Sequence, residues 1–128
     1  MEKEALDILL RGRQPVVVCP ARSIEHARLP AAWRQPIEDG RLLVLSFFGQ
    51  KERRATSERA AFRNECVAAI ADRVLIVYAA PGGKTEALAR KVRAWGKPLL
   101  CLEDEANAGL VSLGAEAVSP FTPFKAAT

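Results

Sequence analysis

The segment RVLIVYAAPGGKTEALARKVRAWGKPLLCL, from Arg73 to Leu102, decides the fold of this chain. It begins and ends with apolar runs of strand length, and between them Leu88, Val92 and Trp95 recur at helical spacing. Gly96 follows, in the position where a glycine commonly ends a helix. The segment therefore predicts a strand, a helix and a second strand, which is the repeating unit of a parallel sheet.

The same alternation extends in both directions from this segment. Continuous apolar runs, typical of strands covered on both faces, occur at Val16–Cys19, Leu42–Phe48, Arg73–Ala79, Pro98–Leu102 and, as an edge candidate, Ala115–Ser119. Helical patterns occur at Met1–Arg11, Pro30–Asp39, Ser57–Ala71, Lys84–Trp95 and Glu105–Leu113. This order predicts an α/β fold, a three-layer parallel sheet of about five strands with helices on both faces.

The length of 128 residues predicts one domain, residues 1–128, with residues 120–128 as an extended C-terminal arm. The apolar runs are too short to span a membrane and the N-terminus does not resemble a signal peptide, so we expect a cytoplasmic protein. Cys19, Cys66 and Cys101 are widely spaced in apolar surroundings, which favours buried, reduced thiols over disulfides or a metal site.

Positive charge is concentrated in one part of the chain. The formal net charge is +4, which favours anionic partners such as nucleotides or nucleic acid. The segment GQKERRATSERAAFRN, residues 49–64, holds Lys51, Arg53, Arg54, Arg59 and Arg63. We expect this cluster to have a function.

Ligands of doubly wound sheets bind outside the carboxyl ends of the strands. The residues that follow the predicted strands are basic, hydroxylated or glycine: Arg22, Ser23, Lys51, Arg53, Arg54, Gly82, Gly83, Lys84 and Thr85. Two glycines before a helix let backbone N–H groups approach a phosphate, although they also suit a plain strand-to-helix turn. The sequence matches neither a P-loop nor a GxGxxG motif, so both readings of Gly82-Gly83 stay open.

Catalytic and cofactor signals are weak by comparison. The single histidine, His26, has no cysteine or carboxylate at metal-ligand spacing, and we expect it on the polar surface. No Ser-His-Asp, Cys-His or paired-carboxylate arrangement is visible in the sequence, and we expect no metal, no cofactor and no catalytic residue. The chain offers a binding site more readily than an active site.

The stretch FRNECVAAIADRVLIVYAAPGGKTEALARKVRAWGKPLLCLED, residues 62–104, resembles the DNA-processing protein A (DprA/Smf) family. Arg63-Asn64, Ala68, Asp72 and the strand Val74–Ala79 match the pattern of that family in the same order. The resemblance implies a Rossmann-like domain that binds single-stranded DNA, assists recombinase loading and forms a homodimer or higher homo-oligomer. It also adds Arg63 and Asn64 to the expected phosphate or nucleic-acid site.

A more distant resemblance concerns the turn alone. Pro81-Gly82-Gly83 is similar to the glycine loop of the lysine-decarboxylase-like ("lonely guy") phosphoribohydrolases, and Lys84-Thr85-Glu86 follows without the second glycine of that loop. Three functions stay open: a domain that binds single-stranded DNA or a nucleotide, a nucleotide sensor, and a nucleoside-monophosphate phosphoribohydrolase. In the last, Glu86 or Glu58 would be the acid/base candidate.

Overall fold

The structure is a computed structural model and describes residues 2–119 of the chain. The chain divides into two compact units, an N-terminal unit of Met1–Arg63 and a C-terminal unit of Asn64–Thr128, which are described separately below. The expected single domain stays a prediction. The expected extended arm, residues 120–128, lies outside the described residues.

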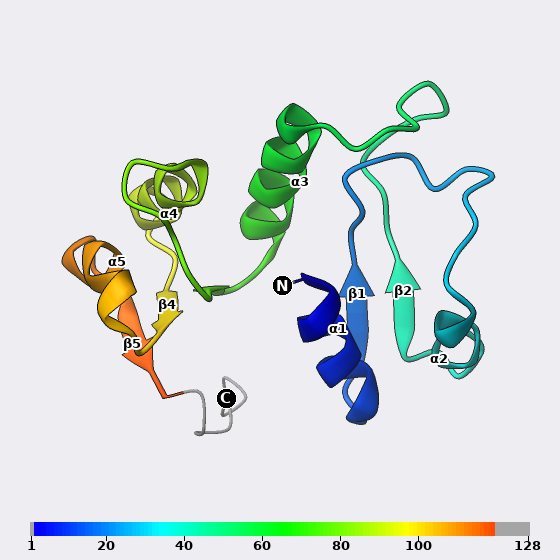
Figure 1. Cartoon of the computed structure of the whole chain (residues 1–128), viewed down its shortest axis with the longest axis horizontal. Helices are drawn as coiled ribbons and strands as arrows, with labels where there is room; N and C mark the ends of the chain where they lie inside the picture. The colour runs from blue at the N-terminus through cyan, green and yellow to red at the C-terminus, as the bar shows by residue number, and fades with distance from the viewer. Residues whose placement is uncertain (1, 120–128) are drawn as a thin grey trace. The chain divides into compact units, whose positions relative to one another are not determined.

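The N-terminal unit contains a two-stranded parallel sheet, and its strands point the same way in Figure 1. Its elements are α1 (Glu2–Arg11), β1 (Val16–Val18), the 3₁₀ helix η1 (Ala31–Trp33), α2 (Arg34–Glu38), β2 (Leu42–Val44) and the first half of α3 (Ser57–Ile70). Parallel strands need a long crossover, and the segment between β1 and β2, which includes η1 and α2, provides it.

The core of this unit lies on one face of its sheet. Leu6 from α1 packs with Val16 and Leu42, which begin the two strands and are paired in register. On the opposite face Val17 and Leu43 lie next to each other, and each is 56% exposed. Side chains alternate between the two faces of a strand, so in this unit burial is one-sided.

The C-terminal unit contains a three-stranded parallel sheet in the order β3-β4-β5. Its elements are the second half of α3, β3 (Val74–Ile76), α4 (Lys84–Ala94), β4 (Leu99–Leu102), the 3₁₀ helix η2 (Glu105–Asn107), α5 (Ala108–Ser112) and β5 (Glu116–Val118). Each strand pairs with the next one along the chain, and a helix lies in each connection, as the segment Arg73–Leu102 predicts.

Small and branched apolar side chains form the core of the C-terminal unit. Ala89 and Val92 of α4 are fully buried, as is Cys101 of the central strand β4, and Leu110 of α5 is 1% exposed. Burial raises the pKa of the Cys101 thiol because the charged thiolate loses its hydration. Of the three residues that mark the helical pattern, Val92 is buried and Leu88 packs against this core, whereas Trp95, at the end of α4, is 42% exposed.

The prediction of a mixed α/β fold with parallel strands is confirmed, and the strands are shorter than the apolar runs. The run Leu42–Phe48 yields a strand only to Val44, because the Ser46 hydroxyl donates to the Arg22 carbonyl at 2.7 Å and accepts from the Phe48 amide at 3.1 Å. These bonds turn the chain away from the sheet. The predicted helices Pro30–Asp39 and Glu105–Leu113 each begin as a 3₁₀ turn and continue as α-helix.

The helices of the described residues are short. None of those within residues 2–119 has both the length and the apolar content that crossing a membrane requires.

Candidate functional site

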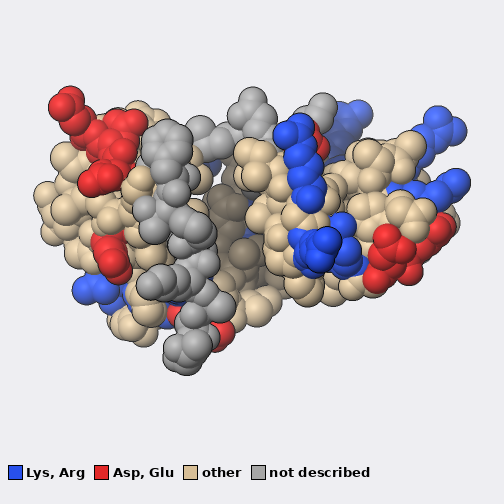
Figure 2. Space-filling model, turned by 90° about the horizontal axis from the view of Figure 1, so that it is seen from below, with Lys and Arg blue, Asp and Glu red and all other residues tan. Residues whose placement is uncertain are grey.

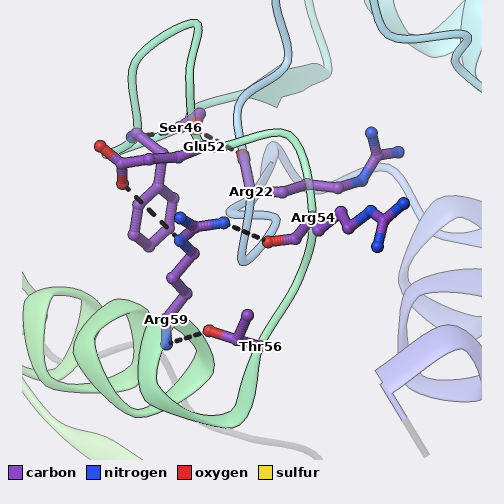
Figure 3. Close-up of polar contacts among 7 residues, drawn as sticks. Arg22, Ser46, Glu52, Arg54, Thr56 and Arg59 are labelled. Carbon is purple, nitrogen blue, oxygen red and sulfur yellow. Dashed lines mark hydrogen bonds and ion pairs between the residues drawn. The ribbon is translucent and has the colours of Figure 1, made fainter.

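The loop that follows β2 packs against the loop that follows β1. The Ser23 amide donates to the Glu52 carbonyl at 2.7 Å, and the Ser46 hydroxyl donates to the Arg22 carbonyl at 2.7 Å. Because parallel strands end at the same edge of a sheet, both loops lie at the carboxyl ends of β1 and β2, as Figure 3 shows for Arg22 and Ser46. The structure therefore brings two of the expected site segments together.

This pair of loops presents several cationic side chains. Lys51, Arg53 and Arg54 are exposed, and Arg22 is half-buried. Arg53 Nε donates to the Gln50 carbonyl at 3.2 Å. Among residues 5–119, whose side chains the structure describes, the cationic groups of Arg22, Lys51 and Arg54 have no hydrogen-bond acceptor or ion-pair partner. In Figure 3 the side chains of Arg22 and Arg54 both extend away from the hydrogen-bonded residues.

Arg59 braces the loop, a role that sequence reasoning missed. Its Nη1 donates to the Arg54 carbonyl at 2.7 Å, and its Nε lies 3.9 Å from a Glu52 carboxylate oxygen (Figure 3). Its amide donates to the Thr56 hydroxyl at 3.1 Å, which is the N-cap bond of α3. Threonine three residues before Arg59 is the sequence signal for that cap, whereas the long-range bonds have no local signal.

Two other expected site residues make internal contacts. Ser23 is 2% exposed, and its hydroxyl accepts from the Glu25 amide at 3.2 Å. Arg63 Nη1 donates to the Cys19 carbonyl at 2.8 Å, joining α3 to the residue that follows β1. These contacts hold the loops in place, and a ligand role for Arg63 stays a prediction.

The remaining expected residues belong to the C-terminal unit. Gly82 has φ +73°, a left-handed conformation that favours glycine, and the Gly83 amide donates to the Ala80 carbonyl at 3.0 Å. Gly83 is the N-cap of α4 and supplies no side-chain cap, so the first N–H groups of that helix have no acceptor within it. Lys84 and Thr85 are exposed in the first turn. This helix start favours an anion.

The carboxylates considered for catalysis differ in their surroundings. Glu86 accepts from Arg90 Nη2 at 2.9 Å, and its side chain is only 12% exposed. The Glu86 carboxylate is therefore engaged in an ion pair within α4. Glu58 is exposed in the N-terminal unit, and Asn64 is half-buried on α3 in the C-terminal unit.

Asn107 was not expected from the sequence, and it is a buried polar side chain of the C-terminal unit with three hydrogen bonds. It is 1% exposed, and its Nδ2 donates to the carbonyls of Val77 and Leu102 at 2.9 Å each. Its Oδ1 accepts from the Ala79 amide at 3.4 Å. One amide thus ties the ends of β3 and β4 together, directly before the Gly82-Gly83 turn.

Charge is mixed on the face in Figure 2, where each unit carries Lys or Arg side chains as well as Asp or Glu side chains. Figure 2 is seen from below Figure 1, where β1 and β2 point upward. For the N-terminal unit it therefore shows the end away from the loop of residues 49–56, the basic loop. Among residues 5–119, whose side chains the structure describes, no group of three or more metal-ligating side chains comes together.

The fold and these loops define a Rossmann-like α/β protein whose strand ends carry basic and glycine-bearing turns. The structure is similar to the X-ray structure of DNA processing protein A (DprA) from Streptococcus pneumoniae, with a TM-score of 0.62 and 15% sequence identity. The match covers 82% of this chain and 40% of that chain. Neither a protein-family model nor a curated protein matches the sequence.

The structural match supports the DprA-like fold that the sequence resemblance implies. The chain spans less than half the length of the matched DprA chain, so the likeness concerns the fold. The resemblance to the lysine-decarboxylase-like superfamily receives no support from these comparisons.

Proposed function

We propose that the chain binds nucleic acid through its phosphates, with Arg22, Lys51, Arg53 and Arg54 at the carboxyl ends of β1 and β2 as the main contacts. The observation that carries this proposal is the docking of the 49–56 loop on the loop after β1, through the Ser23–Glu52 and Ser46–Arg22 hydrogen bonds. Docking fixes the backbone of the loop, so its cationic side chains start from a defined position and less entropy is lost when they bind.

The electrostatics of the loop support an anionic ligand. Arg22, Lys51 and Arg54 carry charges that no described side chain offsets, and like charges on neighbouring loops repel one another. Phosphate groups relieve that repulsion and accept bidentate hydrogen bonds from guanidinium groups. The C-terminal unit offers a second anion-favouring element, the first turn of α4 after Gly83, and we propose that it also contacts phosphate.

The DprA-like fold supports a nucleic-acid ligand over an unrelated anion, because the matched structure is that of a DNA processing protein. We therefore propose single-stranded DNA as the ligand, and a role in DNA processing or recombination. A homodimer or higher homo-oligomer and a cytoplasmic location remain predictions that accompany this proposal.

The test is a binding assay with a fluorescently labelled single-stranded oligonucleotide and with a labelled mononucleotide, each titrated at several salt concentrations. Binding of a strand through several phosphates falls steeply with salt, because each contact releases condensed counterions. We expect strand binding with that steep dependence. Binding of the mononucleotide alone would favour the nucleotide-sensor alternative, and binding of neither would overturn the proposed function.

A further inference from the structure

An open aromatic hollow lies in the same unit as the basic loop. It has a volume of about 350 Å³ and is lined by Phe47, Phe48, Glu52, Glu58, Arg59 and Phe62. Phe62 is 53% exposed, although phenylalanine is more often buried. Its ring centroid lies 5.9 Å from that of Phe48 at an interplanar angle of 59°, so one ring supports the other.

The walls of the hollow are held by hydrogen bonds. The Phe48 amide donates to the Ser46 hydroxyl, which in turn donates to the Arg22 carbonyl. The Glu52 amide donates to the Gly49 carbonyl at 2.9 Å. Arg59, on the far wall, donates to the Arg54 carbonyl. The aromatic rings and the basic loop are therefore parts of one braced structure.

The hollow and the basic loop beside it differ in the balance of their charged side chains. Glu52, Glu58 and Arg59 are among the residues that line the hollow, whereas Lys51, Arg53 and Arg54 are exposed on the adjoining loop, to which Glu52 also belongs. Carboxylates repel a phosphate and accept hydrogen bonds from the N–H groups of a base. A flat, polar-edged group suits the hollow, and an anionic group suits the loop.

We propose that Phe62, supported by Phe48, is a stacking platform for an unpaired nucleobase of a strand whose phosphates contact Arg53 and Arg54. This inference rests on the proposed function and deepens it, since it assigns the base and the backbone to different surfaces of one unit. Base stacking on an aromatic ring tolerates any base because every base has a π-face, but it requires that the base be unstacked. The site therefore prefers single strands over duplexes.

The experiment compares two labelled DNA strands of equal length, one with ordinary bases and one with abasic tetrahydrofuran residues throughout. Both carry the same phosphates, so the difference in their affinities reports contacts to bases. We expect wild-type protein to bind the base-bearing strand about tenfold more tightly. Phe62→Ala should remove this difference, and Phe62→Tyr, which keeps the ring, should retain it.

Two further variants separate the outcomes. Ile70→Ala removes an exposed apolar side chain from the same helix outside the hollow and should keep the tenfold difference. Arg53→Ala/Arg54→Ala should weaken both strands to a similar extent. A base-dependent difference that survives Phe62→Ala, or equal binding of both strands by wild-type protein, would overturn the stacking site and leave the proposed function standing. Binding of neither strand would overturn both.

Discussion

Asn107 Nδ2 lies 2.9 Å from the carbonyl oxygen of Val77, thirty positions earlier in the chain, and donates a hydrogen bond to it. The same nitrogen donates to the Leu102 carbonyl at 2.9 Å. Asn107→Ala leaves these buried acceptors unpaired, and an unpaired buried polar group costs about 1–3 kcal/mol. We expect the free energy of unfolding to fall by at least about 2 kcal/mol in urea titrations.

Ser112→Ala is the control for this substitution. Its hydroxyl donates to the Ala108 carbonyl at 3.1 Å within α5, but the residue is exposed. We expect Ser112→Ala to change the free energy of unfolding by no more than about 0.5 kcal/mol. Equal stability of Asn107→Ala and wild type would contradict the assigned role of Asn107.

Lys97 caps the C-terminal end of α3. Its Nζ donates to the carbonyls of Ala68 at 2.9 Å and Ala71 at 2.7 Å, and also to that of Ala69. A cation at this end of a helix is favourable, and hydrogen bonds to charged groups contribute about 1.5–3 kcal/mol. Lys97→Met should lower the melting temperature by several degrees in thermal unfolding followed by circular dichroism.

The matched variant is Lys91→Met, which removes the same charge from the same unit. Lys91 pairs with Glu65 at 3.1 Å, but both side chains are about half exposed, at 55% and 45%. Exposed pairs contribute about 0–1 kcal/mol. A Lys91→Met protein that is less stable than Lys97→Met would contradict the helix-capping role.

Gly82 should resist substitution for a backbone reason alone. A Cβ there would meet no atom within 4 Å, but φ is +73°, and left-handed backbone costs a non-glycine residue about 1–2 kcal/mol. We expect Gly82→Ala to reduce the free energy of unfolding by that amount in chemical denaturation. Gly49→Ala, equally open and without a positive φ, should be neutral. If Gly82→Ala and Gly49→Ala lowered the free energy of unfolding equally, the left-handed backbone of Gly82 would be excluded as the cause.

The Cys101 thiol gives a pH-dependent prediction. Its folded-state pKa is raised above the ordinary value of 9.0 by burial, so the folded state holds the thiol proton more tightly than the unfolded state does. The contribution of this group to stability is complete below pH 9.0 and is lost as the pH rises through and above it. Urea unfolding measured at pH 7 and at pH 10 should show that the free energy of unfolding falls more for wild type than for Cys101→Ala. An equal fall in both proteins would contradict the contribution assigned to the Cys101 thiol.

The sequence predicts the order of the elements well because each depends on local pattern. The segment Arg73–Leu102 contains its strand signals, its helix period and its stop at Gly96, and the structure has β3, α4 and β4 there. Strand length is predicted poorly, as at Val44, where a contact with distant Arg22 ends the strand.

The candidate site is predictable only in part for the same reason. Sequence order places Arg53 and Arg54 after a strand, but the roles of Asn107 and Arg59 depend on carbonyl groups brought close by folding. A buried asparagine in a short acidic helix has no local pattern that distinguishes it from a solvated one. Ser23 follows a strand as a ligand residue would, and it is buried by the docking of the neighbouring loop.

The most direct test of the central claim is the slope of log affinity against log salt for a single-stranded oligonucleotide, measured in two charge-matched double variants. Arg53→Ala/Arg54→Ala changes the proposed site, and Arg13→Ala/Arg34→Ala removes two exposed arginines that precede β1 and β2, at the other end of that sheet. Losing two phosphate contacts should reduce the magnitude of the slope by about 1.4. We predict that reduction for the first variant and a wild-type slope for the second. Equal slopes in both variants would contradict phosphate binding by this loop.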